Sequence, residues 1–213
     1  MVNFFYEDLL EPQPGSVVVG VDEVGYGALA GPVVAAAAYI PDRNADYVAN
    51  IKDSKALSST KREAIFEELK LHAVFGVGSS NVEEIEEHNI LVASHMAMRR
   101  ALDNLSLCLG KIDLVLVDGV RNLDSAWRTE AIVKGDSLSK SIAAASIVAK
   151  VTRDRLMSTL HTQFAEYAWN KNCGYGTKAH MEALSVHGIT PHHRRTFSPV
   201  KNLAQHSLQN VHS

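Results

Sequence analysis

The chain has 213 residues, of which 46% are hydrophobic and 21% charged, so it indicates a folded domain with a substantial core and excludes global disorder. Its net charge of −3 at pH 7 does not by itself indicate a nucleic-acid partner. The acidic N-terminal residues and the lack of a long apolar run argue against a signal peptide and a membrane span. We therefore expect a single cytoplasmic domain over residues 1–213.

Apolar runs of strand length and apolar residues at helical spacing alternate along the chain. The predicted strands are residues 17–21, 33–40, 73–79, 112–117 and 131–133. The predicted helices are one capped by Thr60 and Glu63, then residues 89–105, residues 142–164 capped by Ser141, and residues 178–186. The continuously apolar run 112–117 predicts a central strand that is buried on both faces. No helical pattern separates the last two strands, so a standard crossover between them is not required.

Four acids stand beside the predicted strands and the long helix: Asp22 and Glu23 after the first strand, Asp118 after the fourth, and Asp136 before the helix. A buried acid is costly unless a positive charge neutralises it. In a regular strand Asp22 and Glu23 point to opposite faces, so both reach one metal only if the strand bends. A single strand-end acid is often a turn former. The set of four favours hard divalent cations, Mg²⁺ or Mn²⁺, and predicts two-metal phosphodiester hydrolysis.

The C-terminal quarter is basic. Residues 148–201 contain eight Lys and Arg residues and three acids, a net charge of +5. This excess predicts a side of the protein that faces phosphates, and the alternative is a solvated charged helix.

Other chemistries compete for parts of the chain and have weaker support. Residues 25–30 match the spacing of a dinucleotide-binding fingerprint, but residues 31–34 lead into a strand where that motif opens a helix. Cys108 and Cys173 lack metal-ligand spacing, so we expect a reduced protein without zinc. The His-His-Arg-Arg run at 192–195 fits a basic or structural loop. The serines at 139, 141 and 146 lack a convincing partnership for nucleophilic catalysis.

Seven short segments then identify a family. They are residues 20–34 (GVDEVGYGALAGPVV), 53–58 (DSKALS), 117–119 (VDG), 134–136 (KGD), 141–154 (SIAAASIVAKVTRD), 174–180 (GYGTKAH) and 187–197 (HGITPHHRRTF). In this combination and order the chain strongly resembles type 2 ribonuclease H, also called ribonuclease HII. Each segment alone would be a weak signal.

The resemblance implies a ribonuclease H-like α/β fold, with a mixed five-stranded sheet flanked by helices and a substrate-binding helical and loop segment at about residues 165–213. It implies an endonuclease that cuts the RNA strand of RNA–DNA hybrids and nicks 5′ of ribonucleotides embedded in duplex DNA, leaving 3′-hydroxyl and 5′-phosphate ends. The related type 3 enzymes carry an N-terminal substrate-binding domain, for which an acid already at position 22 leaves no room. We expect a monomer without membrane partners.

The same resemblance assigns roles to individual residues. The catalytic residues, which hold two divalent cations (Mn²⁺ or Mg²⁺), are Asp22, Glu23, Asp118 and Asp136. Lys55 would contact phosphate, and Tyr175 would stack on the sugar at the RNA-to-DNA junction. The remaining substrate-binding residues are Gly25, Tyr26 and Gly27, whose backbone would read the ribose 2′-hydroxyl, together with Arg194 and Arg195.

Three positions depart from the family pattern. Tyr26 stands where the glycine turn usually has arginine, Val120 where asparagine is frequent, and Cys173 where lysine is usual. These departures leave two alternatives: an RNA–DNA hybrid-binding protein with weakened or lost catalysis, or an enzyme with a shifted substrate preference. The presence of all the acids favours an active enzyme.

Overall fold

The computed structural model describes residues 2–203 and divides into two compact units. The first unit comprises the described residues up to Val24, Val34–Ser79 and Ser94–Val151; the second comprises Gly25–Val33, Ser80–Ala93 and the described residues from Thr152 onward. Each unit has its own cluster of buried apolar side chains. The expected single domain over 1–213 stays a prediction. Of the predicted substrate-binding segment 165–213, residues 204–213 lie outside the described residues.

A five-stranded mixed sheet forms the centre of the first unit, with the order β3-β2-β1-β4-β5. The strands are β1 (Val18–Val24), β2 (Val33–Tyr39), β3 (Val74–Ser80), β4 (Leu114–Asp118) and β5 (Thr129–Ile132). β1 is antiparallel to β2 and parallel to β4, and β4 is parallel to β5. β4 is therefore an interior strand, as its continuous apolar run predicts, and its residues from Leu114 to Val117 are buried.

The helices and shorter turns connect these strands in chain order. The α-helices are α1 (Phe5–Leu10), α2 (Ser59–His72), α3 (Val82–Leu109), α4 (Lys140–His161), α5 (Trp169–Asn172) and α6 (Lys178–His187). The 3₁₀ turns are η1 (Asp46–Asn50), η2 (Ser54–Ala56), η3 (Gly135–Ser137) and η4 (Ala165–Tyr167). No helix separates β4 from β5 in the described structure, so this parallel connection is an irregular loop, as the sequence pattern indicated.

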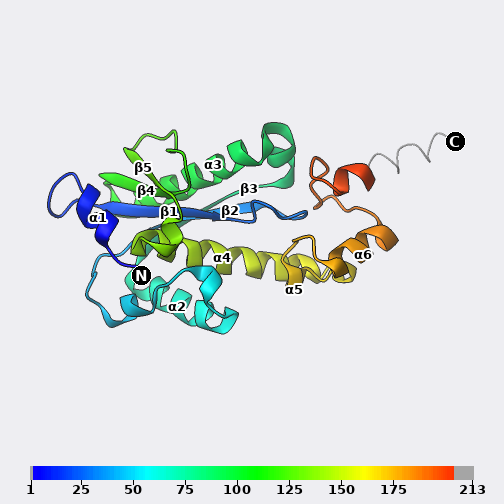
Figure 1. The fold of residues 1–213 in the computed structure, drawn as a ribbon, viewed down its shortest axis with the longest axis horizontal. Coiled ribbons are helices and arrows are strands. Elements are labelled where there is room, and N and C mark those ends of the chain that lie inside the picture. Colours follow the sequence, from blue (N-terminus) through cyan, green and yellow to red (C-terminus); the bar gives the residue numbers. More distant parts are fainter. Residues whose placement is uncertain (1, 204–213) are drawn as a thin grey trace. The chain divides into compact units, whose positions relative to one another are not determined.

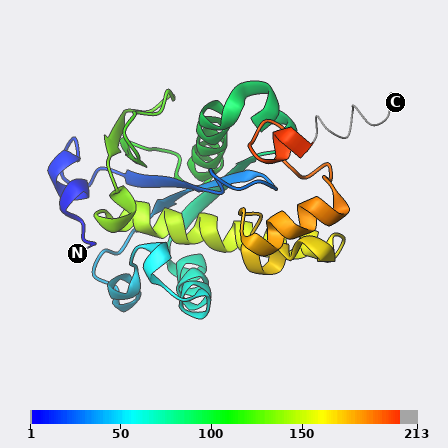
Figure 2. The same ribbon diagram turned by 45° about the vertical axis from the view of Figure 1, so that its right-hand side comes forward.

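Helices cover both faces of the sheet. In the first unit, α3 lies on one face and α4 on the other, with α2 beyond α4, and the rotated view shows the same arrangement (Figures 1 and 2). Glycines allow the close approach: a Cβ atom on Gly20 would lie 2.1 Å from the backbone of Ser141, and one on Gly78 would lie 2.2 Å from the Ala97 carbonyl oxygen. The small alanine side chains of α4 are therefore fully buried, and they belong to the same apolar cluster as residues of β2 and α2.

Two predicted helix caps are wrong, each by a short shift. Ser58, not Thr60, caps α2 and accepts a hydrogen bond from the Lys61 N–H. Ser139, not Ser141, accepts from the Ile142 N–H at the start of α4. Serine and threonine residues crowd both boundaries, so sequence alone did not distinguish which hydroxyl faces the free N–H groups.

The third helix begins earlier than predicted. Residues 82–88 form a helical segment that the sequence reading missed, although Asn81 and Glu84 cap it reciprocally. Asn89 then leaves helical geometry with φ 70°, and its side chain accepts hydrogen bonds from the Leu91 and Val92 N–H groups. The predicted helix 89–105 is the longer segment that starts at this break.

The second unit packs around aromatic residues. Tyr167 and Trp169 are buried and stack with ring centroids 5.2 Å apart, and Met157 and Leu184 close the same apolar cluster. Residues 29–31 pair with the loop after α6 through the bridge of Ala30 with His193. Among the described residues, no helix combines the length and the hydropathy that a membrane span requires.

Candidate metal centre and substrate-contacting residues

Three of the predicted acids meet at one edge of the sheet. β1 and β4 are parallel with Val21 opposite Val117, so Asp22 and Asp118 follow at the same end of neighbouring strands. Asp136 lies in η3, shortly after β5, the other neighbour of β4. One carboxylate oxygen from each of these three acids lies within 4.8 Å of the others. We call these three residues the acid cluster.

Glu23 lies outside the acid cluster. β1 keeps its pairing with β2 through Val24, with Glu23 opposite Ala35. Consecutive side chains of a regular strand point to opposite faces. The bend that would bring Glu23 and Asp22 to one cation is therefore not seen in this strand, and the role of Glu23 as a metal ligand stays a prediction.

Hydrogen bonds orient the acid cluster. The Gly135 N–H donates to Asp118 Oδ1 at 2.6 Å, and the Glu23 N–H donates to Asp22 Oδ1 at 2.8 Å. The Ser146 hydroxyl, on α4, lies 2.9 Å from the Ser54 hydroxyl and acts to lower the pKa of Asp22. Such second-layer contacts hold carboxylates in the orientation that metal binding needs.

Lys55 is the basic residue that contacts the acid cluster. Its ammonium Nζ lies 2.8 Å from Asp136 Oδ2, while its side chain stays 78% exposed. The hydrogen bond to Asp136 raises the pKa of Lys55, so the side chain is a cation at neutral pH. The Asp53 side chain accepts from the Lys55 N–H, and Arg62 donates to the Ser54 carbonyl, which fixes the backbone beneath it.

The acids are electrostatically strained in the absence of a cation. Burial, followed by the charges of Glu23 and Asp118, raises the pKa of Asp22 well above its usual range. Burial raises the pKa of Glu23 to about 7, with the charge of Asp118 as the second cause. Burial and the charge of Asp136 also raise the pKa of Asp118. Oxygen-only ligands that repel one another fit a hard divalent cation.

The predicted substrate-binding turn at residues 25–27 begins the second unit. Gly25 adopts φ 95°, a conformation that favours glycine, and Tyr26 is 41% exposed. The ring of Tyr175 is also 37% exposed and lies 5.6 Å from Arg153 Cζ. Tyr26 and Tyr175 are thus accessible to a ligand.

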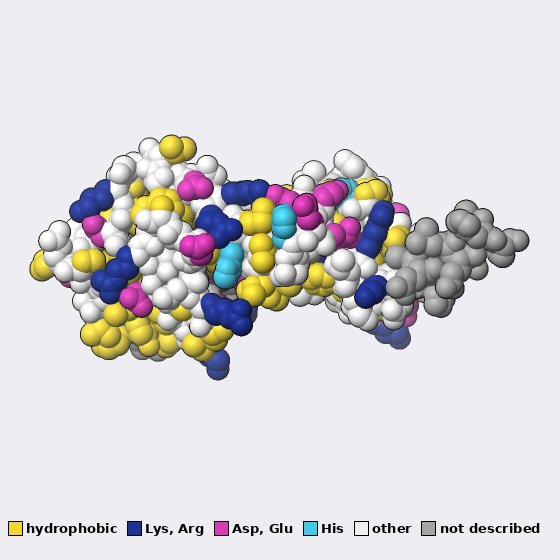
Figure 3. Space-filling model, turned by 90° about the horizontal axis from the view of Figure 1, so that it is seen from above, with side chains coloured by type: hydrophobic (Ala, Val, Ile, Leu, Met, Phe, Trp, Pro, Cys, Tyr) yellow, Lys and Arg dark blue, Asp and Glu magenta, His cyan; other side chains and the backbone are white. Residues whose placement is uncertain are grey.

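The two predicted substrate arginines differ. Arg195 is exposed, and its N–H donates to Glu86 Oε1. Arg194 is fully buried, and its guanidinium donates to the carbonyl oxygens of Gly31 and Tyr26. Its side chain therefore acts on the protein backbone in this structure, whereas the sequence reading expected a direct substrate contact. On the face in Figure 3, acidic and basic side chains of the described residues are interspersed and form no single basic area.

The sequence reading gave no role to Arg153, Ser146 or Ser54. Arg153 follows Ala149 and precedes Met157 at helical spacing, so its position on the buried face of α4 was readable from the pattern. The contact between Ser54 and Ser146 had no comparable signal, because the two residues are 92 positions apart along the chain.

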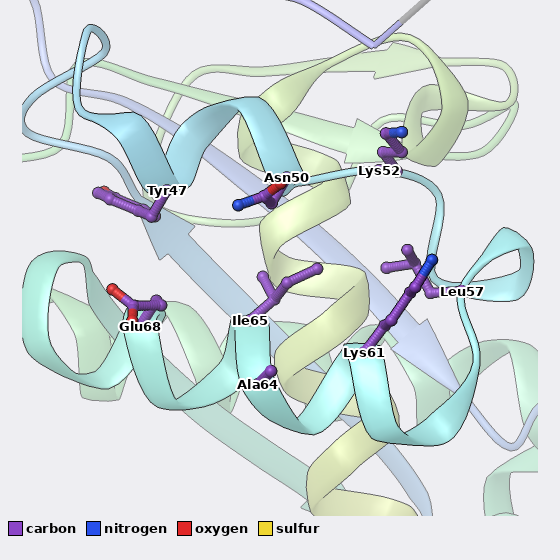
Figure 4. Close-up of a pocket in the computed structure, with 8 residues that line it drawn as sticks. All are labelled: Tyr47, Asn50, Lys52, Leu57, Lys61, Ala64, Ile65 and Glu68. Atoms are coloured by element: carbon purple, nitrogen blue, oxygen red, sulfur yellow. The ribbon is translucent and has the colours of Figure 1, made fainter.

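A separate pocket of about 370 Å³ lies between η1 and α2 (Figure 4). The side chains that line it are Tyr47, Asn50, Lys52, Leu57, Lys61, Ala64, Ile65 and Glu68. None of the predicted site residues belongs to this lining, so it does not contribute to the acid cluster.

The mixed sheet and the acid cluster at the ends of its parallel strands define a metal-dependent nuclease of the ribonuclease H type. The sequence profile of ribonuclease HII matches residues 19–200. A ribonuclease HII from Anaplasma phagocytophilum is 64% identical over 201 residues, covering 94% of this chain and 95% of the relative. The chain therefore belongs to the ribonuclease HII family, and it cuts RNA in RNA–DNA hybrids with a divalent metal cofactor.

Solved structures agree with this fold. Ribonuclease H2 from Pyrococcus horikoshii OT3 superimposes with a TM-score of 0.74 at 28% identity, covering 91% of this chain and 99% of the other. Bst-RNase HIII in complex with Mn²⁺ superimposes with a TM-score of 0.70 at 20% identity, covering 91% of this chain and 71% of the other. The latter shows likeness of fold alone.

Proposed function

We propose that this protein nicks duplex DNA 5′ of a single embedded ribonucleotide, in addition to cutting continuous hybrids, with two divalent cations at the acid cluster. The observation that carries the proposal is the convergence of Asp22, Asp118 and Asp136 within 4.8 Å, a set that includes no cysteine or histidine of residues 2–203. Bound divalent cations would supply an activated water and stabilise charge on the leaving 3′-oxygen. The Mn²⁺ complex of Bst-RNase HIII makes Mn²⁺ a suitable test cation beside Mg²⁺.

The protein groups have separate tasks in this proposal. Asp22, Asp118 and Asp136 would hold the cations, and the Ser146 hydroxyl near Asp22 favours its ionised form. Lys55, mostly exposed and bonded to Asp136, offers its ammonium group to the phosphate beside the cleaved bond. A cation bound at the acid cluster would neutralise Asp136, and Lys55, now paired with Asp136, would then be available to the phosphate.

Ribonucleotide recognition falls to the turn at 25–27 and to Tyr175. The turn would bind the 2′-hydroxyl through main-chain groups, because this hydroxyl distinguishes RNA from DNA. Tyr175 would stack on the neighbouring sugar with its exposed ring. The Tyr26 carbonyl accepts from Arg194 and the Gly25 carbonyl accepts from the Ala28 N–H, so the 2′-hydroxyl would bind to other main-chain groups of the turn.

The test is cleavage of a duplex that carries one ribonucleotide, with Mg²⁺, Mn²⁺ or EDTA, followed by mapping of the cut. We expect one product that ends 5′ of the ribonucleotide, with a 3′-hydroxyl end, and no product in EDTA. An all-deoxy duplex of the same sequence is the substrate control, and Asp118→Asn is the protein control. A duplex left intact while a continuous hybrid is cut would refute the proposal.

A further inference from the structure

Two arginines of the second unit are buried, and neither pairs with a carboxylate of the described residues. Arg153 lies on α4 and Arg194 in the loop after α6, and both are 0% exposed. Within the described part of the chain, all their hydrogen bonds go to main-chain carbonyl oxygens. Burying a guanidinium group is unfavourable unless its N–H groups are hydrogen-bonded. The hydrogen bonds of a buried arginine therefore fix the main-chain groups that accept them.

The bonds of the two arginines converge on residues 25–32, which we call the glycine segment. Arg153 donates to Pro32 through Nε at 2.9 Å and to Ala30 through Nη2 at 3.0 Å. Arg194 donates to Gly31 through Nε at 3.0 Å and to Tyr26 through Nη1 at 2.9 Å. Four carbonyl groups of this short segment thus accept hydrogen bonds from the two buried guanidinium groups.

Arg153 also holds a second segment, residues 173–177, which we call the tyrosine loop. Its Nη1 donates to the Cys173 carbonyl oxygen at 2.8 Å. The Leu29 and Ala30 N–H groups donate to the Gly174 carbonyl oxygen at 2.8 and 3.3 Å. One guanidinium group therefore ties the glycine segment to the tyrosine loop, and the two backbones are also bonded directly.

The contact is too close for side chains at two glycines. A Cβ atom on Gly25 would lie 2.1 Å from Arg153 Nε, and one on Gly174 would lie 2.5 Å from the Ala30 carbonyl oxygen. Both glycines have positive φ, 95° and 81°. The glycines of these motifs are thus required by packing around Arg153 as well as by turn geometry.

We propose that Arg153 and Arg194 are positioning residues that fix the spacing between the turn at 25–27 and the ring of Tyr175, and thereby determine selectivity for a single embedded ribonucleotide. This inference rests on the proposed function, in which the turn binds the ribonucleotide and Tyr175 its neighbour. A single ribonucleotide offers one register, which both groups must match together. A continuous hybrid offers a 2′-hydroxyl at every step, so it tolerates a change in spacing better.

The test compares Arg153→Lys and Arg194→Lys with the wild type. Lysine keeps the charge, but one ammonium group cannot reproduce the planar fork that reaches carbonyls of separate segments. The matched control is Arg128→Lys, an exposed residue that pairs with Glu130. We measure kcat and KM on a single-ribonucleotide duplex and on a continuous hybrid, after circular dichroism has verified folding.

We expect kcat/KM on the single-ribonucleotide duplex to fall by about tenfold to a hundredfold in both test variants, since small misplacements of binding groups have effects of this order. The hybrid should lose much less, and Arg128→Lys should match the wild type on both substrates. Equal losses on the two substrates, or no loss on either, would overturn the inference.

Amide hydrogen exchange provides a readout that does not depend on metal or substrate. We expect the Leu29 and Ala30 amides to lose protection in Arg153→Lys, while the amides of β1 keep theirs. Unchanged protection at Leu29 and Ala30 would overturn the positioning role. A wild type that cuts the hybrid and leaves the single-ribonucleotide duplex intact would refute the proposed function alone, because lost protection would still support the fixed spacing.

Discussion

Like charges are buried in two regions of this protein. The two regions differ in the interactions that offset the unfavourable free energy of burying them. In the first unit, Asp22, Asp118 and Asp136 crowd their carboxylates, with Lys55 as a mostly exposed counter-charge. In the second unit, Arg153 and Arg194 are more deeply buried, yet main-chain carbonyl oxygens accept their hydrogen bonds. The arginines bind main-chain groups of their own unit, whereas the three acids have one lysine counter-charge and favour a divalent cation in addition.

The difference shows how to separate a structural charge from a functional one. A buried charge whose hydrogen bonds go to internal partners stabilises the arrangement around it, and its removal leaves those partners unsatisfied. A buried charge that faces other charges of the same sign destabilises the metal-free protein. Removal of a charge should therefore change stability in opposite directions in the two regions.

The largest expected effect is on catalysis. Asp22→Asn and Asp118→Asn each remove a charge that holds the cation, so cleavage of an RNA–DNA hybrid should fall on the order of 10³-fold or more, equivalent to about 4 kcal/mol. The metal-free melting temperature should stay equal or rise, because repulsion within the acid cluster is relieved. Near-normal turnover in Mg²⁺ would contradict the metal assignment, and a large drop in melting temperature would indicate a structural role.

The opposite sign of stability change is expected at the arginines. Arg153→Met leaves the carbonyl groups of Ala30, Pro32 and Cys173 without their donor, so the free energy of unfolding should fall by about 3 kcal/mol. Urea unfolding measures this loss, and Arg128→Met serves as the exposed control. A variant as stable as the wild type would show that burial of the charge costs as much as its bonds contribute.

Substitutions of Tyr175 test whether the ring beside Arg153 contacts the substrate. The ring is partly exposed and lies near Arg153, so Tyr175→Ala should weaken binding of a single-ribonucleotide duplex by roughly 1–3 kcal/mol, by analogy with aromatic stacking on bases. Tyr175→Phe should bind almost normally, since it keeps the ring. Titrations with a catalytically inactive Asp118→Asn background measure the affinities. Equal losses on a continuous hybrid would argue against a role at the junction.

The pH dependence of stability should also differ in sign. Burial lowers the pKa of His193, in the second unit, from 6.5 to about 3. The unfolded chain therefore binds more protons between these values, and stability falls as pH decreases through that window, by up to about 1.4 kcal/mol per pH unit for this one group. The Thr190 N–H donates to His193 Nδ1, so protonation of this nitrogen would break that hydrogen bond.

In metal-free protein, Glu23 changes stability with pH in the direction opposite to His193. Its pKa is raised from 4.5 to about 7, so the folded state binds more protons in this window and stability falls as pH increases. His193→Gln should flatten the acid limb of the stability profile, and Glu23→Gln should flatten the neutral limb. His88→Gln, at an exposed position, is the control. Melting curves from pH 4 to 8 in EDTA would show both changes, and unaltered slopes would contradict the assignments.

The smallest expected effect is a gain at Tyr26. The side chain is 41% exposed while its carbonyl is held by Arg194, so arginine fits here without disturbing the backbone. An exposed contact between arginine and a phosphate contributes at most about 1 kcal/mol, so Tyr26→Arg should raise kcat/KM by a few fold. The ratio of cleavage at ribonucleotides to cleavage at deoxynucleotides should stay the same. Unchanged or reduced kcat/KM would show that replacing the usual arginine by Tyr26 has not cost this protein a phosphate contact.

Much of the fold follows from local pattern. The five strands lie within a few residues of their predicted positions, since buried apolar runs bounded by glycine and acids need no distant information. The predicted caps Thr60 and Ser141 are wrong because several neighbouring hydroxyls could serve, and only packing selects Ser58 and Ser139. The helical segment at 82–88 was missed because it is short and mostly acidic.

The site divides in the same way. Sequence by itself determined that acids stand at strand ends, that glycines surround position 26, and that the chain resembles ribonuclease HII, because residue type and spacing carry these properties. Tertiary structure decided that Asp22, Asp118 and Asp136 bring carboxylate oxygens within 4.8 Å of one another, since strand register sets which carboxylates share an edge. Glu23 interacts with Asp22 and Asp118 through its charge. Tertiary structure also decided that Arg194 is buried beside Arg153, because hydrogen bonds to distant carbonyl groups, which no local pattern records, outweigh the tendency of arginine to stay in water.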